Sequence, residues 1–342
     1  MKRIWWNIKY YFGRLKNMDN EGFKEAVNYA HEKSGKPKFI IFLDMVWCSF
    51  RYTAGYVDYN EFEFYLINGK QRQTYITLGQ SDKVVKAYND QNYVDVFDDK
   101  SKFVREFSEF IHRDHIDLRE VGVPEFESFV MKHRKVMAKK TNDYVGRGID
   151  KIDIDETPNL DFEKLYNELK ASEQYLIEVF FKQHPVMDTL SDKSVNTLRI
   201  ITFLDDDNIP RVLVRVLKSG LGKHLDNIGQ GGMYTLLNEE GVVEYPFIDK
   251  YGNQHTTNPI NGRELIGFTV PDYKKVEAQV KEVCLKVPQV RYIGWDVAVS
   301  PEGNAELIEG NTSTGPFQLA PSLSPDKTGV KPIYEKYMDI KF

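Results

Sequence analysis

The stretch RYIGWDVAVSPEGNAELIEGN (291–311) places two carboxylates among apolar residues. Residues 301–304 are typical of a turn, and the flanking segments have strand character. A turn centred on this loop sets Asp296 opposite Glu309, with Asn311 on the same side of the strand as Glu309. Opposed carboxylates repel one another, and an oxygen-seeking cation such as Mg²⁺ would reverse that interaction. The pattern therefore predicts Asp296, Glu309 and Asn311 as metal ligands; the alternative is a carboxylate pair splayed into solvent. The same register sets Val299 opposite Glu306 and Val297 opposite Ile308.

A second candidate site lies in VMAKKTNDYVGRGIDKI (136–152). A strand delivers Lys139 and Lys140, and the loop after it carries Gly146 and Gly148. Glycines let backbone amides approach phosphate oxygens, and a lysine supplies a point charge. The spacing matches neither a Walker A motif nor a dinucleotide fingerprint, so an ordinary glycine turn after a basic strand is the alternative.

Two arginines interrupt apolar strands farther along the chain. Arg199 lies in SVNTLRIITFL (194–204), and Arg215 lies in the strand that follows. A buried arginine needs an anionic partner, and a guanidinium matches phosphate or carboxylate oxygens. We interpret the pair as a cradle for such an anion; the alternative is that they pair with structural carboxylates or extend into solvent.

A third strand, QYLIEVFF (174–181), carries one carboxylate. Glu178 could accept hydrogen bonds from ribose hydroxyls, and the backbone of Val179, Phe180 and Phe181 could read an adenine edge. By itself this segment is typical of an ordinary strand.

The surrounding pattern predicts an α+β protein. Helices are expected at 20–34 and 272–286, residues 81–134 have a charged helical character, and 38–50 fits a buried strand or a helix. From residue 136 onward, short β-branched strands alternate with loops. A mixed N-terminal part should therefore lead into a mainly antiparallel catalytic part.

The composition excludes several classes of protein. A net charge of −5 over 342 residues argues against nucleic acid as the main partner. Two distant cysteines argue against a disulfide framework or a zinc site and favour a reducing compartment. No apolar run reaches the roughly 20 residues that span a bilayer. We expect a cytoplasmic protein.

The N-terminal segment MKRIWWNIKYYFGRLK is basic and aromatic. It is not typical of a signal peptide, because charges interrupt it and no small-residue cleavage site follows. Residues 1–17 could lie peripherally on the inner face of a membrane. A helix that docks on the body of the protein is the interpretation we favour.

The motif HRDH (112–115) resembles part of a protein-kinase catalytic loop. No matching Asn or Asp-Phe-Gly follows it, and its two histidines have no evident third partner for a metal. We assign it no chemistry.

In order, these segments resemble the ATP-grasp superfamily, and most closely its sugar-transfer-associated branch, which is related to α-L-glutamate ligases. The resemblance covers roughly residues 50–320. It is carried by YVDYNEFEFY, FDDKSKF, VMAKKTNDYVGRGI, EVFFKQHPVMDTLSDKSVNTLRI, DNIGQGGM, NPINGRELIGFTVP and GWDVAVSPEGNAELIEGN. Two departures are that Lys140 stands where the family usually has proline, and Asn258 stands where His is typical.

The resemblance implies ATP held between two α+β subdomains under a glycine-rich loop. Lys139 or Lys140 would reach the phosphates, with Gly146 and Gly148 in the loop. The other roles carried over are adenosine binding by Glu178 and the Val179–Phe181 hinge, Mg²⁺ ligation by Asp296, Glu309 and Asn311, and stabilisation of the transferred phosphoryl group or an acyl phosphate by Arg199 and Arg215.

The implied activity is that of an ADP-forming ligase that joins a carboxylate to an amine or a sugar-linked acceptor through an acyl phosphate, in cell-envelope polysaccharide biosynthesis. The alternatives are a phosphotransferase and a non-catalytic ATP-binding partner of a glycosyltransferase. The expected regions are an N-terminal region (1–75), a helical region (76–135), a small ATP-grasp subdomain (136–185), a metal-binding subdomain (186–325) and a tail (326–342).

Overall fold

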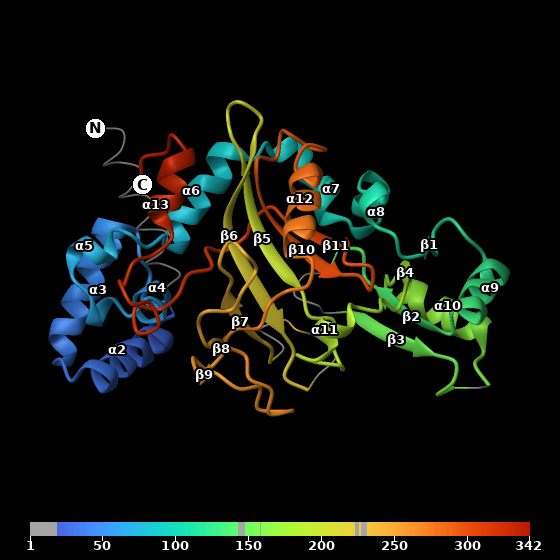
Figure 1. The fold of residues 1–342 in the computed structure, drawn as a ribbon, viewed down its shortest axis with the longest axis horizontal. Coiled ribbons are helices and arrows are strands. Elements are labelled where there is room, and N and C mark those ends of the chain that lie inside the picture. Colours follow the sequence, from blue (N-terminus) through green and yellow to red (C-terminus); the bar gives the residue numbers. More distant parts are fainter. Residues whose placement is uncertain (1–18, 143–147, 158, 223–225, 227–230) are drawn as a thin grey trace. The chain divides into compact units, whose positions relative to one another are not determined.

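A computed structural model describes residues 19–142, 148–157, 159–222, 226 and 231–342 (Figure 1). The chain divides into two compact units. Unit 1 combines residues up to 87 with residues 315–342, and unit 2 comprises residues 88–314. The predicted N-terminal segment 1–17 and Gly146 lie outside the described residues. Among the described residues, no helix combines the length and apolar character that crossing a bilayer requires.

Unit 1 is helical where the structure describes it. Helix α2 begins after Asp19, whose side chain accepts a hydrogen bond from the Glu21 N–H, and it ends at Gly35, which adopts a left-handed φ of 68°. The ambiguous segment 38–50 is helical. The helices of this unit are α2 (Asn20–Ser34), α3 (Lys38–Tyr52), α4 (Tyr56–Glu61), η1 (Phe64–Leu66), α5 (Gly69–Arg72), most of α6 (Leu78–Tyr88) and α13 (Lys331–Tyr337).

The chain returns to unit 1 after it leaves unit 2. The Gln318 side chain accepts from the Ile76 N–H at 2.9 Å and donates to the Ile76 carbonyl at 2.8 Å. Both backbone groups are buried, so the returning segment satisfies polar atoms that water cannot reach.

Unit 2 contains a four-stranded sheet in the order β1-β4-β2-β3. Its apolar residues pack with Phe126 and Val130 of α9 and with Tyr166 and Leu169 of α10. The elements are β1 (His115–Asp117), α9 (Val123–His133), β2 (Lys135–Lys139), β3 (Ile149–Asp153), α10 (Phe162–Ala171) and β4 (Leu176–Val179).

A seven-stranded antiparallel sheet forms the rest of unit 2, in the order β11-β10-β5-β6-β7-β8-β9. Val276 and Val280 of α12 join its core, and short helices precede the small sheet. The remaining elements are η2 (Gln91–Tyr93), α7 (Asp95–Asp98), α8 (Lys100–Glu106), η3 (Ser108–Phe110), α11 (Pro185–Asp188), β5 (Leu198–Leu204), β6 (Pro210–Ser219), β7 (Met233–Leu236), β8 (Phe247–Asp249), β9 (Gln254–His255), α12 (Tyr273–Val283), β10 (Tyr292–Val299) and β11 (Ala305–Asn311). The predicted α+β class is confirmed.

The register of the final hairpin is only partly as predicted. Asp296 does pair with Glu309, but the pairing shifts by one residue between Asp296 and Val297. A β-bulge in β11 absorbs the extra residue. Toward the turn, Val299 therefore faces Ala305 rather than Glu306, and Val297 faces Leu307 rather than Ile308.

Candidate active site

Asp296 is paired with two cationic side chains, those of Arg199 and Lys218. Its Oδ1 accepts from the Nε of Arg199 at 2.5 Å and lies 3.0 Å from the Nζ of Lys218, while its Oδ2 accepts from Nη2 of Arg199 at 2.7 Å. The side chains of Asp296 and Lys218 are 6% and 7% exposed. The structure thus compensates this buried carboxylate with protein charges. Lys218 was not among the site residues predicted from the sequence.

The pKa of Asp296 reflects the same balance. Burial would raise that pKa, but Arg199 and then Lys218 hold it well below its usual range. Burial likewise would lower the pKa of Arg199, and Asp296 raises it. Asp296 and Arg199 therefore each stabilise the charged form of the other.

Glu309 and Asn311 differ from Asp296 because they line a cavity. The Glu309 side chain is 43% exposed, and its Oε1 accepts from Nδ2 of Asn311 at 3.1 Å. Nη2 of Arg199 lies 3.8 Å from the same oxygen. Glu309 and Asn311 fit the oxygen chemistry of Mg²⁺, whereas both Asp296 oxygens are already engaged by cations. Within the described part of the chain, no three His, Cys, Asp or Glu side chains form a metal-binding group.

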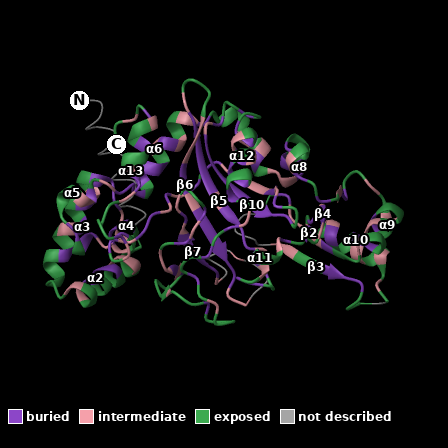
Figure 2. Cartoon of the chain, in the orientation of Figure 1, coloured by how far each residue is buried: buried purple, intermediate pink, exposed green. Residues whose placement is uncertain are grey.

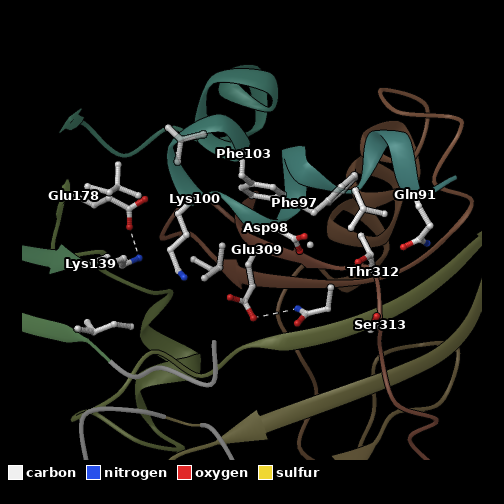
Figure 3. A pocket seen from close by; sticks show the side chains of 17 residues that line it. Gln91, Phe97, Asp98, Lys100, Phe103, Lys139, Glu178, Glu309, Thr312 and Ser313 are labelled. Carbon is white, nitrogen blue, oxygen red and sulfur yellow. Dashed lines mark hydrogen bonds and ion pairs between the residues drawn. The ribbon is translucent and has the colours of Figure 1, made fainter. Parts of the chain in front are cut away.

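The cavity has a volume of about 470 Å³ and lies within unit 2 (Figure 3). Such a volume falls in the range of about 300–1,000 Å³ that is usual for small-molecule sites. Its walls come from the α7–α8 region, the small sheet and the end of β11. They comprise Gln91, Val94, Phe97, Asp98, Lys100, Phe103, Val104, Lys139, Ile149, Leu176, Glu178, Ile308, Glu309, Gly310, Asn311, Thr312 and Ser313.

Glu178 is held inside an ion-pair network. It is 1% exposed, and its Oε1 accepts from Nη2 of Arg113 at 2.6 Å, while Lys139 pairs with its Oε2. Burial would raise the pKa of Glu178, but Arg113 and Lys139 lower it to about 2. In this arrangement the Glu178 carboxylate neutralises two cations, so it does not present two open acceptors to a ribose.

Arg113 joins the two sheets of unit 2. Besides Glu178 of β4, it donates through Nη1 to Oε1 of Glu306 and to the Leu307 carbonyl of β11, both at 2.7 Å. The side chains of Arg113, Glu178 and Glu306 are each at most 5% exposed. This residue lies in the HRDH motif, to which the sequence analysis assigned no chemistry.

The structure separates the two neighbouring lysines. Lys139 lines the cavity, whereas Lys140 is not among the lining residues. The Lys140 N–H donates to the Gly148 carbonyl at 3.0 Å, and Gly148 has a φ of +63°. The positive φ favours glycine at this position, and a Cβ there would lie 2.6 Å from the Lys140 side chain, which would have to shift.

The predicted adenine hinge is only partly available. The backbone N–H of Val179 donates to the Asp114 carbonyl at 3.0 Å, and that of Phe180 donates to the Lys135 carbonyl at 3.1 Å. Val179, Phe180 and Phe181 do not line the cavity.

Lys100 is a cavity residue that the sequence analysis missed. It is the first residue of α8, and its side chain extends into the space between Lys139 and Glu309 (Figure 3). The segment FDDKSKF contributed to the family resemblance, but nothing in its local pattern distinguished this lysine from a solvated one.

Arg215 is not brought together with Arg199. Arg215 pairs with Ile200, the neighbour of Arg199, so the two arginines point to opposite faces of the sheet. The Nε of Arg215 donates to Oε2 of Glu277 on α12 at 2.7 Å. Burial would raise the pKa of Glu277, but Arg215 and Lys281 lower it to about 2. The expected two-arginine cradle is not formed, and Arg215 anchors α12.

This placement yields a prediction for Arg215→Gln. The substitution should lower the free energy of unfolding by about 1–3 kcal/mol, because Glu277 loses its main partner but keeps Lys281. The affinity for ATP should stay within twofold. Urea denaturation and calorimetric titration measure the two effects, and Glu277→Gln is the matched control. A tenfold loss of ATP affinity at unchanged stability would instead place Arg215 in the nucleotide site.

The family model described as sugar-transfer-associated ATP-grasp matches residues 79–326. A search of curated proteins finds no match.

Solved structures that resemble the chain include two ligases and a synthase. An N5-carboxyaminoimidazole synthase from Aspergillus clavatus, in complex with ADP, has 10% identity and a TM-score of 0.38, over 69% of this chain and 50% of that one. ATP-grasp ligase PsnB, complexed with minimal precursor, Mg and ADP, has 12% identity and a TM-score of 0.38, over 74% and 63%. A D-alanine-D-alanine ligase from Coxiella burnetii has 9% identity and a TM-score of 0.38, over 71% and 53%. The chain therefore spans between half and two thirds of each of these proteins.

Proposed function

Since the chain belongs to the sugar-transfer-associated ATP-grasp family, we propose that it is an ATP- and Mg²⁺-dependent, ADP-forming ligase that joins a carboxylate to an amine or similar nucleophile. The observation that carries this proposal is the arrangement of charges around the unit 2 cavity. Lys100 and Lys139 line it together with the oxygen donors Glu309 and Asn311. Cations suit the phosphates of a nucleotide, and oxygen donors suit its metal ion.

In the proposed reaction, a carboxylate oxygen attacks the γ-phosphorus of ATP, ADP leaves, and an acyl phosphate forms. The amine then attacks the acyl carbon, phosphate leaves, and the amine proton passes to solvent. Lys100 and Lys139 hold the phosphates, and Arg199 supplies positive potential beside Glu309. Glu309 and Asn311 are the residues that would hold Mg²⁺, which when bound would supply neutralisation of charge on the phosphoryl oxygens. No residue needs to act as a covalent nucleophile.

The proposed acceptor is a sugar-linked molecule of the cell envelope, and a glycosyltransferase is the proposed partner. The description of the family, which associates it with sugar transfer, supports this part of the proposal. Because fold-level likeness is a weak argument for a substrate, product analysis has to identify it.

The nucleotide site is tested with a matched pair of lysine variants. Lys139→Met should weaken ATP binding by about 10- to 100-fold, since it removes a charged hydrogen bond of about 1.5–3 kcal/mol. Lys140→Met should change binding less than twofold, because Lys140 does not line the cavity. Calorimetric titration with and without Mg²⁺ measures both, and thermal denaturation checks that the variants are folded. Equal losses in both variants, or no nucleotide binding by the wild type, would contradict the assignment.

The reaction class is tested by the products. A ligase releases ADP and free phosphate in equal amounts when a carboxylate and an amine are both present. A stable phosphorylated acceptor would instead indicate a phosphotransferase. Nucleotide binding without turnover of any carboxylate and amine tested would favour a non-catalytic ATP-binding module.

A further inference from the structure

Helix α3 of unit 1 is apolar on two opposite sides. Ile41, Met45, Cys48 and Tyr52 face the core of this unit and are buried. A helix that is apolar all round normally has all of its surface covered. In α3 the large apolar side chains of the second side are exposed, and Figure 2 colours much of this helix as exposed.

The second side, which we call the α3 apolar face, holds seven large exposed side chains. At about 100° per residue they fill an arc of about 160° that contains no polar residue. Their exposed fractions run from 36% for Val46 to 68% for Phe39, with 60% for Trp47. Contiguous apolar patches of this kind mark interaction sites. The members are Phe39, Ile40, Phe42, Leu43, Val46, Trp47 and Phe50.

The charges around this face are positive. Lys38 and Arg51, both exposed, border the arc on its two sides. The only acidic residue of α3 is Asp44, and it is neutralised on the core side by an ion pair of 2.6 Å with Arg72 and a hydrogen bond of 2.7 Å from the Tyr59 hydroxyl. No carboxylate of α3 therefore faces outward unpaired.

The same end of the chain is basic as a whole. Residues 1–52 contain ten Lys or Arg and five Asp or Glu, although the complete chain has a net charge of −5. Residues 1–18 account for five of those cations and no acidic residue, and they include Trp5, Trp6, Tyr10 and Tyr11. The excess of positive charge at this end of the chain lies in residues 1–18, while residues 19–52 carry five cations and five carboxylates.

We infer that the α3 apolar face is a docking surface for an anionic lipid bilayer. Interfacial helices combine Trp, Phe and Leu on one face with flanking Lys and Arg, and their binding depends on buried apolar area together with attraction to anionic lipid. A protein partner would call for hydrogen-bonding groups within the patch, whereas the side chains inside this arc include none other than the indole N–H of Trp47. The inference concerns unit 1 alone and does not depend on the proposed nucleotide site.

The test is co-sedimentation of the full chain with vesicles. We expect the wild type to pellet with vesicles of phosphatidylcholine and phosphatidylglycerol, and to pellet less with phosphatidylcholine alone or in 0.5 M salt. Trp47→Glu combined with Phe50→Glu should reduce the bound fraction on anionic vesicles at least tenfold. Ile260→Glu is the matched control, because Ile260 is 61% exposed but lies in unit 2. It should bind like the wild type.

Three results would overturn the inference. The wild type could stay in the supernatant with anionic vesicles, or the double variant could pellet as well as the wild type. A dimer in light scattering that Trp47→Glu and Phe50→Glu abolish, in a chain that does not bind vesicles, would assign the face to a second copy. Because all substituted side chains are exposed, unchanged thermal unfolding will confirm that the variants are folded.

Discussion

Glu309→Gln is expected to remove the Mg²⁺-dependent part of ATP binding and to lower ATP turnover at least about 100-fold. The substitution keeps the size of the side chain but replaces an anionic oxygen at the cavity wall with an amide. Since Glu309 is 43% exposed and belongs to no tightly buried pair, the free energy of unfolding should change by less than about 1 kcal/mol.

Calorimetric titration of ATP with and without Mg²⁺ measures the first effect, and ADP release measures the second. Glu302→Gln, in the exposed turn of the same hairpin, is the control that changes charge away from the cavity. Asp296 would be a poorer test, because its removal takes a shared buried carboxylate from the cations Arg199 and Lys218 and so confounds function with stability. An unchanged Mg²⁺ dependence in Glu309→Gln would remove this residue from the proposed metal site.

Arg113→Ala should be the most destabilising single substitution proposed for this chain, at about 3–5 kcal/mol. It leaves Glu306 buried without its cation and Glu178 with Lys139 alone, and it cuts the link between the two sheets of unit 2. Urea denaturation measures the loss. Adding Glu178→Gln and Glu306→Gln to Arg113→Ala should recover much of it, because no buried carboxylate then lacks a cation. Failure to recover would indicate that packing, rather than charge, accounts for the loss.

Acid titration gives an independent check of the same network. The pKa of Glu178 is lowered to about 2 in the folded chain, from an ordinary value near 4.5. The stability that its ionised form contributes is therefore fully present above pH 4.5 and is lost as the pH falls toward 2. In Arg113→Ala this acid-dependent part should shrink, because the cation that most strongly favours the charged form is gone. An unchanged slope of stability against pH in this range would exclude Glu178 as its source.

The strands that carry the site could be predicted because their residues are β-branched and apolar. The Asp296–Glu309 pairing followed from the turn residues alone. The bulge beside it could not be predicted, because Ala305, Glu306 and Leu307 are buried in succession and this strand gives no clean alternation from which an inserted residue could be detected. Helix α3 was ambiguous for a related reason: residues that are apolar on both sides of a helix erase the periodicity that distinguishes it from a strand.

The charged residues of the site show where local sequence reasoning stops. Arg199 and Arg215 have similar sequence surroundings, yet they lie on opposite faces of the sheet. Their faces depend on the register between β5 and β6, which neither strand's own residues determine. Lys218 lies on the same face of the sheet as Arg199, but this follows only from the pairing of β5 with β6. Arg113 pairs with Glu178 and Glu306, which are 65 and 193 residues away in the sequence. Its role therefore could not be predicted from its neighbours in the chain.

The return of the chain at Gln318 has a consequence for synthesis on the ribosome. Unit 2 is continuous in sequence. Unit 1 is not, and the buried backbone groups of Ile76 have their partner Gln318 only after more than 200 further residues are translated. During synthesis a continuous unit can fold as soon as it emerges from the ribosome. The first segment of a discontinuous unit cannot complete its folding until the second segment has been made. The nascent helices α2–α5 should thus be the part of the chain most dependent on chaperones, and the last to become resistant to protease.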